Sequence, residues 1–462
     1  MNRKNAAEPL KSVDPHDGQV LDTYAQHTDP QISSIVDEVL HAQQRWSHRD
    51  AYERARPLAR LADRLRENQD AWAMLMTAEM GKPIAESEAE ILKCAWLCDY
   101  YADHAPTFLA TAEEATDAKL AQVHFRPLGV VLAIMPWNFP FWQTLRFAAP
   151  AIAAGNGVVL KHASNVSGCA LALERLFADC LPAGLLRTVL CSSDRMRRLI
   201  TDERISAVTF TGSTGAGKRV GEAAGSGLKK TVLELGGSDP YLILEDADIE
   251  TAAEVCAAAR LVNSGQSCIA AKRFIVAHRV YDQFHTALCD LMLDVSMGNP
   301  RNRGNRIGPL ARADLAQRLA RQVAKSVTEG ARLTSGATAG PDGAYFPATV
   351  LGEVRPGMPA ADEELFGPVA AVLKAWNETE MIELANHSPF GLGGAVFTSD
   401  ESKGRRIAAD ALEVGSAAVN GRVVSDPRLP FGGIKNSGFG RELSRFGILE
   451  FVNVKTVVTF DS

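Results

Sequence analysis

The stretch ISAVTFTGSTGAGKRVGEAAG, residues 205–225, indicates the fold class more clearly than any other part of the chain. A β-rich run, residues 205–211, leads into a turn of small residues at Gly212 and Ser213, and a helical segment follows. The start of a helix presents free backbone N–H groups, which together with a hydroxyl suit a phosphate or pyrophosphate. The stretch therefore predicts either a phosphate-binding turn between a strand and a helix, or a strand–helix turn without a ligand.

The same stretch is spelled almost like the phosphate loop of nucleoside triphosphatases. Gly212 is followed, after four residues, by Gly217 and Lys218. In that loop the next residue is Ser or Thr, because its hydroxyl binds Mg²⁺. Here the next residue is Arg219, and the GxGxxG fingerprint of dinucleotide-binding folds is not matched either. The sequence therefore argues against an ATPase and leaves open a phosphate site of another kind or a strand–helix turn without a ligand.

Strand-like and helical runs alternate on both sides of this stretch, which predicts an α/β fold with doubly wound parallel sheets. Strands separated by helices pair in parallel through right-handed crossovers. The N-terminal part, residues 29–82, has helical periodicity, and a run at 118–127 alternates as an exposed strand does. The predicted strands lie at 129–136, 156–164, 187–193, 205–212, 270–280, 368–375 and 448–460, with helices at 144–155 and 168–180 between the first of them.

Composition limits the class of protein. The chain has 462 residues and a net charge of −6, and its Lys and Arg residues are scattered, so neither nucleic acid nor an anionic membrane is expected as partner. No run approaches the roughly 18 apolar residues of a membrane span, and the N-terminus has no secretory-signal pattern. The eight cysteines form no CxxC or zinc-type spacing, so we expect no metal and a reducing, cytoplasmic setting.

Three residues in small-residue or apolar contexts are candidates for catalysis. Glu234, in LELGG, has apolar neighbours that raise a carboxyl pKa and suit a general base, although an ion-paired or solvated Glu is the alternative. Cys268, in NSGQSCIAA, lies 34 residues later and is a candidate nucleophile or a buried structural cysteine. Asn138, in MPWNFP, is a candidate amide donor to an oxyanion, or a turn residue.

Together these segments resemble the aldehyde dehydrogenase family over nearly the whole chain. Within that family the sequence is most similar to the shorter bacterial succinate-semialdehyde dehydrogenases. The resemblance is carried, in the family's order, by PWNFP, VVLKHAS, FTGST, LELGG, GQSC, EELFGPV, SPFGL and PFGGIKNSGFGRE.

The resemblance implies an aldehyde dehydrogenase-like fold with two doubly wound parallel-sheet domains and a small β oligomerisation element. A discontinuous dinucleotide-binding domain would comprise residues 1–109 and 126–236, rejoined by about 430–444. The catalytic domain would span 237–429. The oligomerisation element would comprise 110–125 and 445–462, and its terminal strand has an edge that a neighbouring copy could cover. A homodimer or homotetramer is therefore expected.

The resemblance also implies the chemistry of the site. Cys268 would attack the aldehyde carbon, the Asn138 amide and the Cys268 N–H would hold the oxyanion, and Glu234 would activate water to release the acid. The residues expected to bind the dinucleotide are Trp137, Lys161, Ser164, Gly212, Ser213, Glu364 and Phe366. Many NAD-preferring relatives have Glu where this chain has Ser164. A Glu at this position would repel the 2′-phosphate of NADP⁺. Ser164 removes this repulsion and Lys161 supplies a cation, so NADP⁺ is expected to be preferred and NAD⁺ still used.

The substrate expectation is an aldehyde with a distal carboxylate, with succinate semialdehyde as the first candidate. Arg146 matches an arginine that holds this carboxylate in relatives, and Trp142 and Gln143 would line the entrance. The second arginine of many such enzymes is Val262 here, and the sequence leaves open whether a neighbouring cation compensates, the two considered being Arg260 and Arg445. The alternatives are a broad enzyme for apolar or aromatic aldehydes, an acylating enzyme that uses coenzyme A, an ATPase and a catalytically silent member of the fold.

Overall fold

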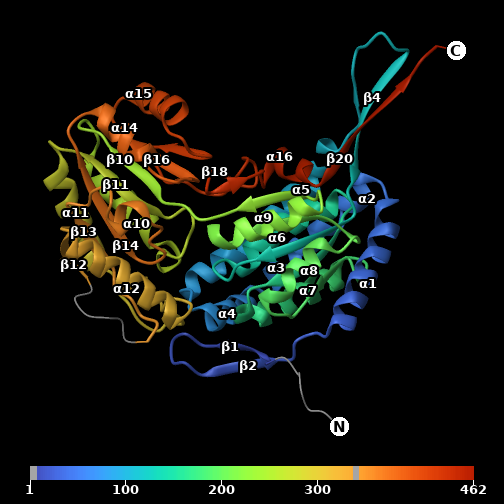
Figure 1. Cartoon of the computed structure of the whole chain (residues 1–462), viewed down its shortest axis with the longest axis horizontal. Coiled ribbons are helices and arrows are strands. Elements are labelled where there is room, and N and C mark those ends of the chain that lie inside the picture. The colour runs from blue at the N-terminus through green and yellow to red at the C-terminus, as the bar shows by residue number, and fades with distance from the viewer. Residues whose placement is uncertain (1–7, 337–342, 462) are drawn as a thin grey trace.

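The computed structural model describes residues 8–336 and 343–461 of the chain. Two large parallel sheets, each flanked by helices, lie in opposite halves of the molecule, and a narrow β arm projects from one end (Figure 1). This arrangement confirms the predicted α/β class with two doubly wound sheets and a small additional β element.

The first sheet has the strand order β19-β9-β8-β5-β6-β7. All its pairings are parallel except that of β19 with β9. The order runs outward from β5 to β6 and β7 on one side, and from β8 to β9 on the other. Ligands in such sheets bind where the order reverses, beyond the carboxyl ends of the strands. The strands are β5 (Val130–Met135), β6 (Gly157–His162), β7 (Leu186–Thr188), β8 (Ile205–Thr211), β9 (Lys230–Glu234) and β19 (Gly438–Phe439).

Helices α6 (Pro140–Ala153), α7 (Ser167–Cys180), α8 (Met196–Thr201) and α9 (Thr214–Ser226) connect the strands of the first sheet. The predicted helix-rich N-terminal part forms α1 (Asp29–Ser47), α2 (Ala51–Ala55), α3 (Pro57–Glu67), α4 (Gln69–Met80) and α5 (Ile84–Phe108). Helix α1 begins with a capping box between Thr28 and Gln31, which satisfies otherwise free N–H groups of the first turn. The strand predicted at 187–193 is shorter than expected, because only Leu186–Thr188 pair with β6.

The second sheet has the order β12-β13-β14-β11-β10-β16-β17 and is parallel except for its edge strand β12. Its central strands β10 and β11 are buried along their whole length, as both faces of a parallel sheet require. The strands are β10 (Asp239–Ile243), β11 (Ala271–Ala277), β12 (Arg332–Ser335), β13 (Thr349–Gly352), β14 (Val369–Ala375), β16 (Gly393–Phe397) and β17 (Ser416–Val419). The helices are α10 (Ile249–Leu261), α11 (Tyr281–Leu293), α12 (Ala313–Thr328), α13 (Pro359–Asp362), α14 (Glu378–Asn386) and α15 (Glu401–Arg406).

The arm is a three-stranded antiparallel sheet in the order β20-β4-β3. Strands β4 (Leu120–Pro127) and β20 (Val452–Thr459) pair over their full length, and β3 (Ala112–Glu113) adds a short edge. The terminal strand was predicted to begin at residue 448, and that start is wrong. Residues Ser444–Glu450 form helix α16 instead, which packs on α5 and α6, and the strand begins at Val452.

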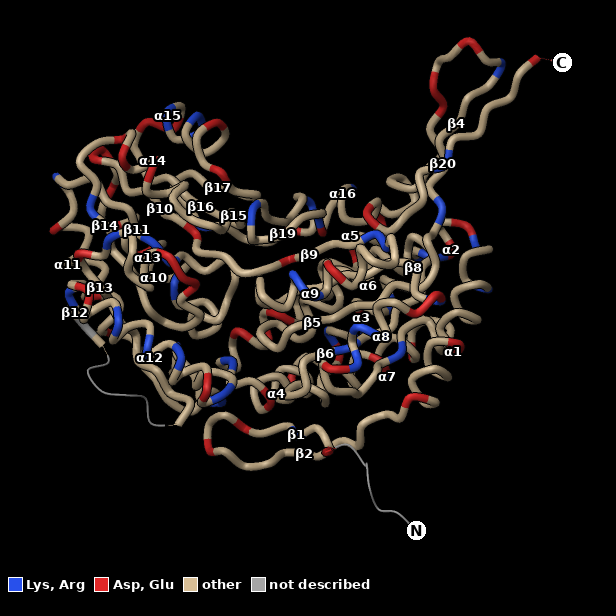
Figure 2. Tube along the Cα trace, viewed as in Figure 1, with Lys and Arg blue, Asp and Glu red and all other residues tan. Residues whose placement is uncertain are grey.

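Two further strand pairs complete the fold. They are β1 (Leu10–Val13) with β2 (Val20–Tyr24), and β15 (Phe390–Gly391) with β18 (Ile434–Lys435). Acidic and basic residues are interspersed along the chain trace (Figure 2). Within residues 8–336 and 343–461, no helix has both the length and the apolar character needed to cross a membrane.

Candidate active site

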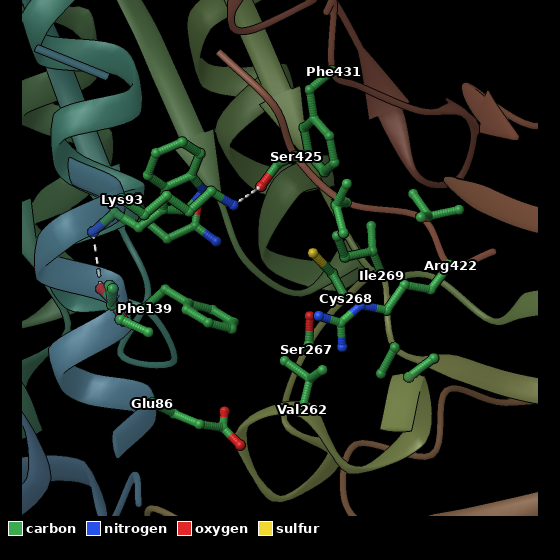
Figure 3. A pocket seen from close by; sticks show the side chains of 18 of the residues that line it. Glu86, Lys93, Phe139, Val262, Ser267, Cys268, Ile269, Arg422, Ser425 and Phe431 are labelled. Atoms are coloured by element: carbon green, nitrogen blue, oxygen red, sulfur yellow. Dashed lines mark hydrogen bonds between the residues drawn. The ribbon is translucent and has the colours of Figure 1, made fainter. Parts of the chain in front are cut away.

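Two cavities, each of about 330 Å³, meet at Cys268. Cys268 and Gln143 line both. The first cavity, shown in Figure 3, has a wall of mixed cationic and aromatic residues. They include Lys93, Phe139, Trp142, Arg146, Val262, Arg306, Arg422, Ser425 and Phe431. The second cavity lies beyond the carboxyl ends of β5 and β8, where the strand order of the first sheet reverses. Its wall includes Trp137, Asn138, Gly212, Ser213, Glu364 and Phe366.

The loop that carries Cys268 is held in an unusual backbone conformation. Asn263, Ser264 and Gly265 all have positive φ, at 53°, 54° and 77°. A Cβ at Gly265 would lie 2.3 Å from the carbonyl carbon of Gly367, so only glycine fits. Asn263 Nδ2 donates to the Asn138 carbonyl at 2.7 Å. This contact holds the loop before β11, a strand of the second sheet, against the segment that follows β5 in the first sheet.

A buried lysine holds the backbone around the thiol. Lys272 Nζ donates to the carbonyl oxygens of Ser267 at 3.0 Å and Cys268 at 2.7 Å. It also lies 3.9 Å from Glu364 Oε1. Burial raises the pKa of Cys268 to about 12, and the positive charges of Arg146 and Lys272 act in the opposite direction. The thiol is therefore protonated at neutral pH in this arrangement and has to lose its proton before it can attack a substrate.

The Asn138 side chain is buried in the second cavity beside Cys268. Its Nδ2 donates to the Gln266 carbonyl at 3.1 Å. A side-chain amide has two N–H bonds, so one such contact leaves a second donor for another acceptor. The amide is therefore held by the loop that carries Cys268, and its second N–H makes it a candidate oxyanion donor.

Glu234 is the last residue of β9, is 2% exposed, and both its carboxyl oxygens lack a hydrogen-bond partner among the described residues. Burial, followed by the neighbouring Glu442, raises its pKa well above the ordinary value. The apolar sequence context of Glu234 predicts the same upward shift of its pKa. However, Glu234 does not line either cavity, and its carboxyl packs close to Gly432, where a Cβ would lie 2.8 Å from Oε1.

The second cavity has the features of a dinucleotide site. Ser213 lies directly before α9, where free N–H groups suit a phosphate, and Gly212 keeps the turn open beside it. The rings of Trp137 and Phe366 meet edge to face at 5.7 Å, and Glu364 Oε1 accepts from the Gly237 N–H at 3.0 Å. A carboxylate and two aromatic rings next to a thiol fit the ribose and ring of a nicotinamide nucleotide.

Arg146 lies in the first cavity, but its charge is already paired. Its Nη2 is 2.5 Å from Glu442 Oε2, and the two side chains are only 2% and 3% exposed. The guanidinium also lies over the Phe431 ring, 4.7 Å from its centroid. Trp142 and Gln143 line the cavity as expected, and Lys93 Nζ lies 4.0 Å from the centroid of the Trp142 ring.

A family model, the aldehyde dehydrogenase family, matches residues 2–457. The chain belongs to this family. It is 46% identical over 415 residues to the NAD(P)⁺ succinate semialdehyde dehydrogenase Sad of Escherichia coli K12, covering 89% of each chain. It is 42% identical over 455 residues to an NADP⁺ succinate-semialdehyde dehydrogenase of Mycobacterium tuberculosis H37Rv, covering 97% of this chain and 99% of the relative.

The fold agrees with that of solved aldehyde dehydrogenases. A succinic semialdehyde dehydrogenase from Streptococcus pyogenes, solved in complex with NADP⁺, superposes with a TM-score of 0.95 at 36% identity. The match covers 98% of this chain and all of the other. The family and the fold class expected from the short motifs are therefore confirmed.

In this aldehyde dehydrogenase, Lys161 and Ser164 do not line either cavity. Lys161 is the penultimate residue of β6 and Ser164 follows that strand, at the same carboxyl edge of the sheet as the turn after β8. Ser164 is exposed, while Lys161 is half-buried and its pKa is lowered by burial. The contact that Lys161 and Ser164 are expected to make with the dinucleotide therefore lies outside the second cavity.

Three cationic residues that line the first cavity were not predicted from the sequence, namely Lys93, Arg306 and Arg422. They come from three distant segments and are marked by no motif. Arg260 and Arg445, the two arginines considered as replacements for the missing second arginine, do not line this cavity. Arg260 is fully buried and its Nη2 donates to the Gly265 carbonyl at 2.6 Å, whereas Arg445 is exposed on α16. The remaining seven cysteines are buried, as expected for packing residues.

Proposed function

We propose that this enzyme oxidises succinate semialdehyde to succinate, with NADP⁺ preferred and NAD⁺ accepted. The observation that carries the proposal is the position of Cys268. This thiol lies between a cavity with cationic side chains and a second cavity with the features of a nicotinamide nucleotide site. The names of relatives that are 42% to 46% identical support the same substrate and cofactor.

The residues of the site fit a reaction through a thioester. The Cys268 thiolate adds to the aldehyde carbon, and the carbonyl oxygen becomes an oxyanion. The free N–H of the Asn138 amide and the Cys268 backbone N–H stabilise that oxyanion, and one such donor is worth about 3 kcal/mol in the transition state. NADP⁺, when bound in the second cavity, would accept the hydride that leaves the former aldehyde carbon as the oxyanion re-forms a carbonyl group. The products of this half of the reaction are an acyl-Cys268 thioester and NADPH.

Water then cleaves the acyl–sulfur bond, which yields the carboxylic acid and restores the Cys268 thiol. Glu234 is proposed to take the proton from this water, and its raised pKa suits a base that works near neutral pH. Because Glu234 does not line either cavity in this structure, its side chain has to turn toward Cys268 for this step. Such hydrolysis distinguishes the proposed reaction from acyl transfer to coenzyme A.

The proposed cofactor preference depends on Ser164. A carboxylate at this position would repel a 2′-phosphate and accept hydrogen bonds from ribose hydroxyls, whereas serine does not repel the phosphate. In the variant Ser164→Glu we expect the ratio of kcat/KM for NADP⁺ to that for NAD⁺ to fall by at least about tenfold. Steady-state rates with both cofactors measure this ratio. An unchanged ratio would contradict the assignment, and Ser164→Ala serves as the uncharged control.

A broad enzyme for apolar or aromatic aldehydes is the second candidate, because Phe139, Trp142 and Phe431 line the first cavity. The two candidates differ in their response to substrate charge. With purified wild-type enzyme and NADP⁺, we expect kcat/KM to be at least about tenfold higher for succinate semialdehyde than for butanal, which has the same chain length and no carboxylate. A preference for butanal or benzaldehyde would favour the second candidate.

We further propose that the protein is a cytoplasmic homodimer or homotetramer that associates through the arm. Strand β20 carries several exposed apolar residues, which another copy of the chain would cover. They are Val454, Val457 and Val458, at 58%, 41% and 41% exposure. Sedimentation or light scattering of the purified protein tests the oligomeric state.

A further inference from the structure

The backbone N–H of Cys268 is a donor without a partner in the protein. Among residues 8–336 and 343–461, it donates to no carbonyl and to no side chain. Since Cys268 lines both cavities, this N–H is free to donate to a ligand. A donor to an oxyanion is effective when its direction is fixed before the reaction begins. The groups that fix the peptide bond before Cys268 therefore matter to the chemistry.

One buried ammonium group holds both peptide groups that flank Cys268. Lys272 Nζ donates to the Ser267 carbonyl and to the Cys268 carbonyl, and it also contacts the Ala270 carbonyl at 3.3 Å. A lysine has three N–H donors only when it is protonated, so three carbonyl partners indicate the charged form. Lys272 is 1% exposed and lies on β11. Its ammonium group is therefore a fixed charge inside the loop that carries the thiol.

The Ser267 carbonyl and the Cys268 N–H belong to the same peptide group. This peptide is trans, and in a planar trans peptide the C=O and N–H bonds point in opposite directions. The Ser267 carbonyl accepts from Lys272 and also from the Ala270 N–H at 3.2 Å. These two bonds direct the Cys268 N–H away from Lys272. A charged donor on the carbonyl also polarises the peptide group, which makes its N–H a stronger donor.

The charge of Lys272 also acts on the thiol. Positive groups near Cys268 favour its thiolate and negative groups oppose it. The groups that face it are Arg146 on α6, Lys272 on β11, Glu364 before β14 and Glu234 on β9.

Lys272 is itself surrounded by charged groups. Burial lowers its pKa, whereas the carboxylates of Glu364 and Asp239 oppose this change and the Arg260 charge adds to it. The Glu364 carboxylate is the nearer partner with a measured contact, since its Oε1 lies 3.9 Å from Lys272 Nζ. The two carboxylates therefore help to keep Lys272 protonated.

We infer that Lys272 is a positioning residue for the reaction: it directs the Cys268 N–H toward the oxyanion and its charge favours the Cys268 thiolate. This inference rests on the proposed function, because it concerns the nucleophile and the oxyanion donor of that reaction. The two effects can be measured separately. Turnover needs both the donor and the thiolate, whereas alkylation of the thiol needs the thiolate alone.

The test uses purified full-length Lys272→Met and Lys272→Gln with NADP⁺, and whichever of succinate semialdehyde and butanal the wild type oxidises faster. In Lys272→Met we expect kcat to fall by about ten- to a hundredfold, with the aldehyde KM within about threefold of the wild-type value. Gln keeps N–H donors without the charge, so its kcat should lie between those of Lys272→Met and the wild type. Because Gln also keeps a polar group at the buried site, Lys272→Gln decides the question if Lys272→Met does not fold.

The second measurement is the rate of Cys268 alkylation by iodoacetamide at about pH 9 without aldehyde. Below the thiol pKa this rate follows the fraction of thiolate, and loss of a nearby cation raises that pKa. We expect the rate to fall by about tenfold in both variants, because both lack the charge.

Lys229→Met is the matched control. Lys229 Nζ also donates to two backbone carbonyls, those of Asp202 and Ile205, but it lines neither cavity. This variant should melt at a lower temperature and keep the wild-type kcat and alkylation rate. A purely structural role of Lys272 predicts the same pattern for its own variants.

If the Lys272 variants keep both kcat and the alkylation rate within about twofold of the wild type, the inference is overturned. The proposed function then still stands, provided that turnover is lost in Cys268→Ala. If Cys268→Ala retains turnover, the thioester mechanism fails, and the inferred role of Lys272 fails with it.

Discussion

Replacing Cys268 with alanine is expected to lower kcat/KM for aldehyde oxidation by roughly 10⁴-fold or more, because the reaction loses its covalent nucleophile. Among the described cysteines, Cys268 is the one that lines both cavities and the one that is only partly buried. No neighbouring thiol can replace it, since Ile269, Ala270 and Ala271 follow in the sequence. The measurement is the initial rate of reduced-cofactor formation over a range of aldehyde concentrations, from which kcat/KM is obtained.

Thiol labelling provides the control for this variant. Under native conditions we expect iodoacetamide to modify one cysteine in the wild type, slowly because the raised pKa keeps the Cys268 thiol protonated, and none in Cys268→Ala, because the other seven thiols are buried. Cys289→Ala, which removes a buried thiol on α11, should retain wild-type turnover. Activity of Cys268→Ala within about tenfold of the wild type would contradict the thioester mechanism.

The fold was predictable from the sequence because its local signals agree with its long-range pairings. The run at 205–225 forms β8, the turn and α9 as expected, and the buried runs near residues 130 and 271 form β5 and β11. The end of the chain was less predictable. The short apolar run Ile448-Leu449 fits either a strand or a helix, and the packing of α16 on α5 and α6 decides for the helix.

The positions of Cys268, Asn138 and Gly212 follow from their motifs, since each lies on a loop whose backbone conformation depends on its neighbours. The electrostatic partners of the site do not follow from sequence. Arg146 and Glu442 are 296 residues apart and meet only because α16 and its preceding loop return to the first unit. Arg422 and Val262, which both line the first cavity, are 160 residues apart in the chain, and no local pattern links them. Such contacts depend on tertiary packing and not on spacing.

The variant Arg146→Met is expected to lose about 3–5 kcal/mol of folding free energy near neutral pH, because it leaves the Glu442 carboxylate buried without its cation. Burial already raises the pKa of Glu442, and Arg146 is the charge that opposes this rise. Without Arg146 the pKa of Glu442 in the folded state rises further above its unfolded value. The stability of the variant should therefore be greatest in acid and fall as pH rises through the folded-state pKa. Thermal melting measured from about pH 5 to about pH 8 follows this change.

The double variant Arg146→Met/Glu442→Leu separates a structural role from a substrate-binding one. If Arg146 serves mainly as the partner of Glu442, removing both charges should restore much of the melting temperature that Arg146→Met loses, because no unpaired carboxylate is left at that position. If Arg146 instead holds the substrate, Arg146→Met should melt like the wild type and lose succinate semialdehyde selectively against butanal. The ion pair with Glu442 favours the first result.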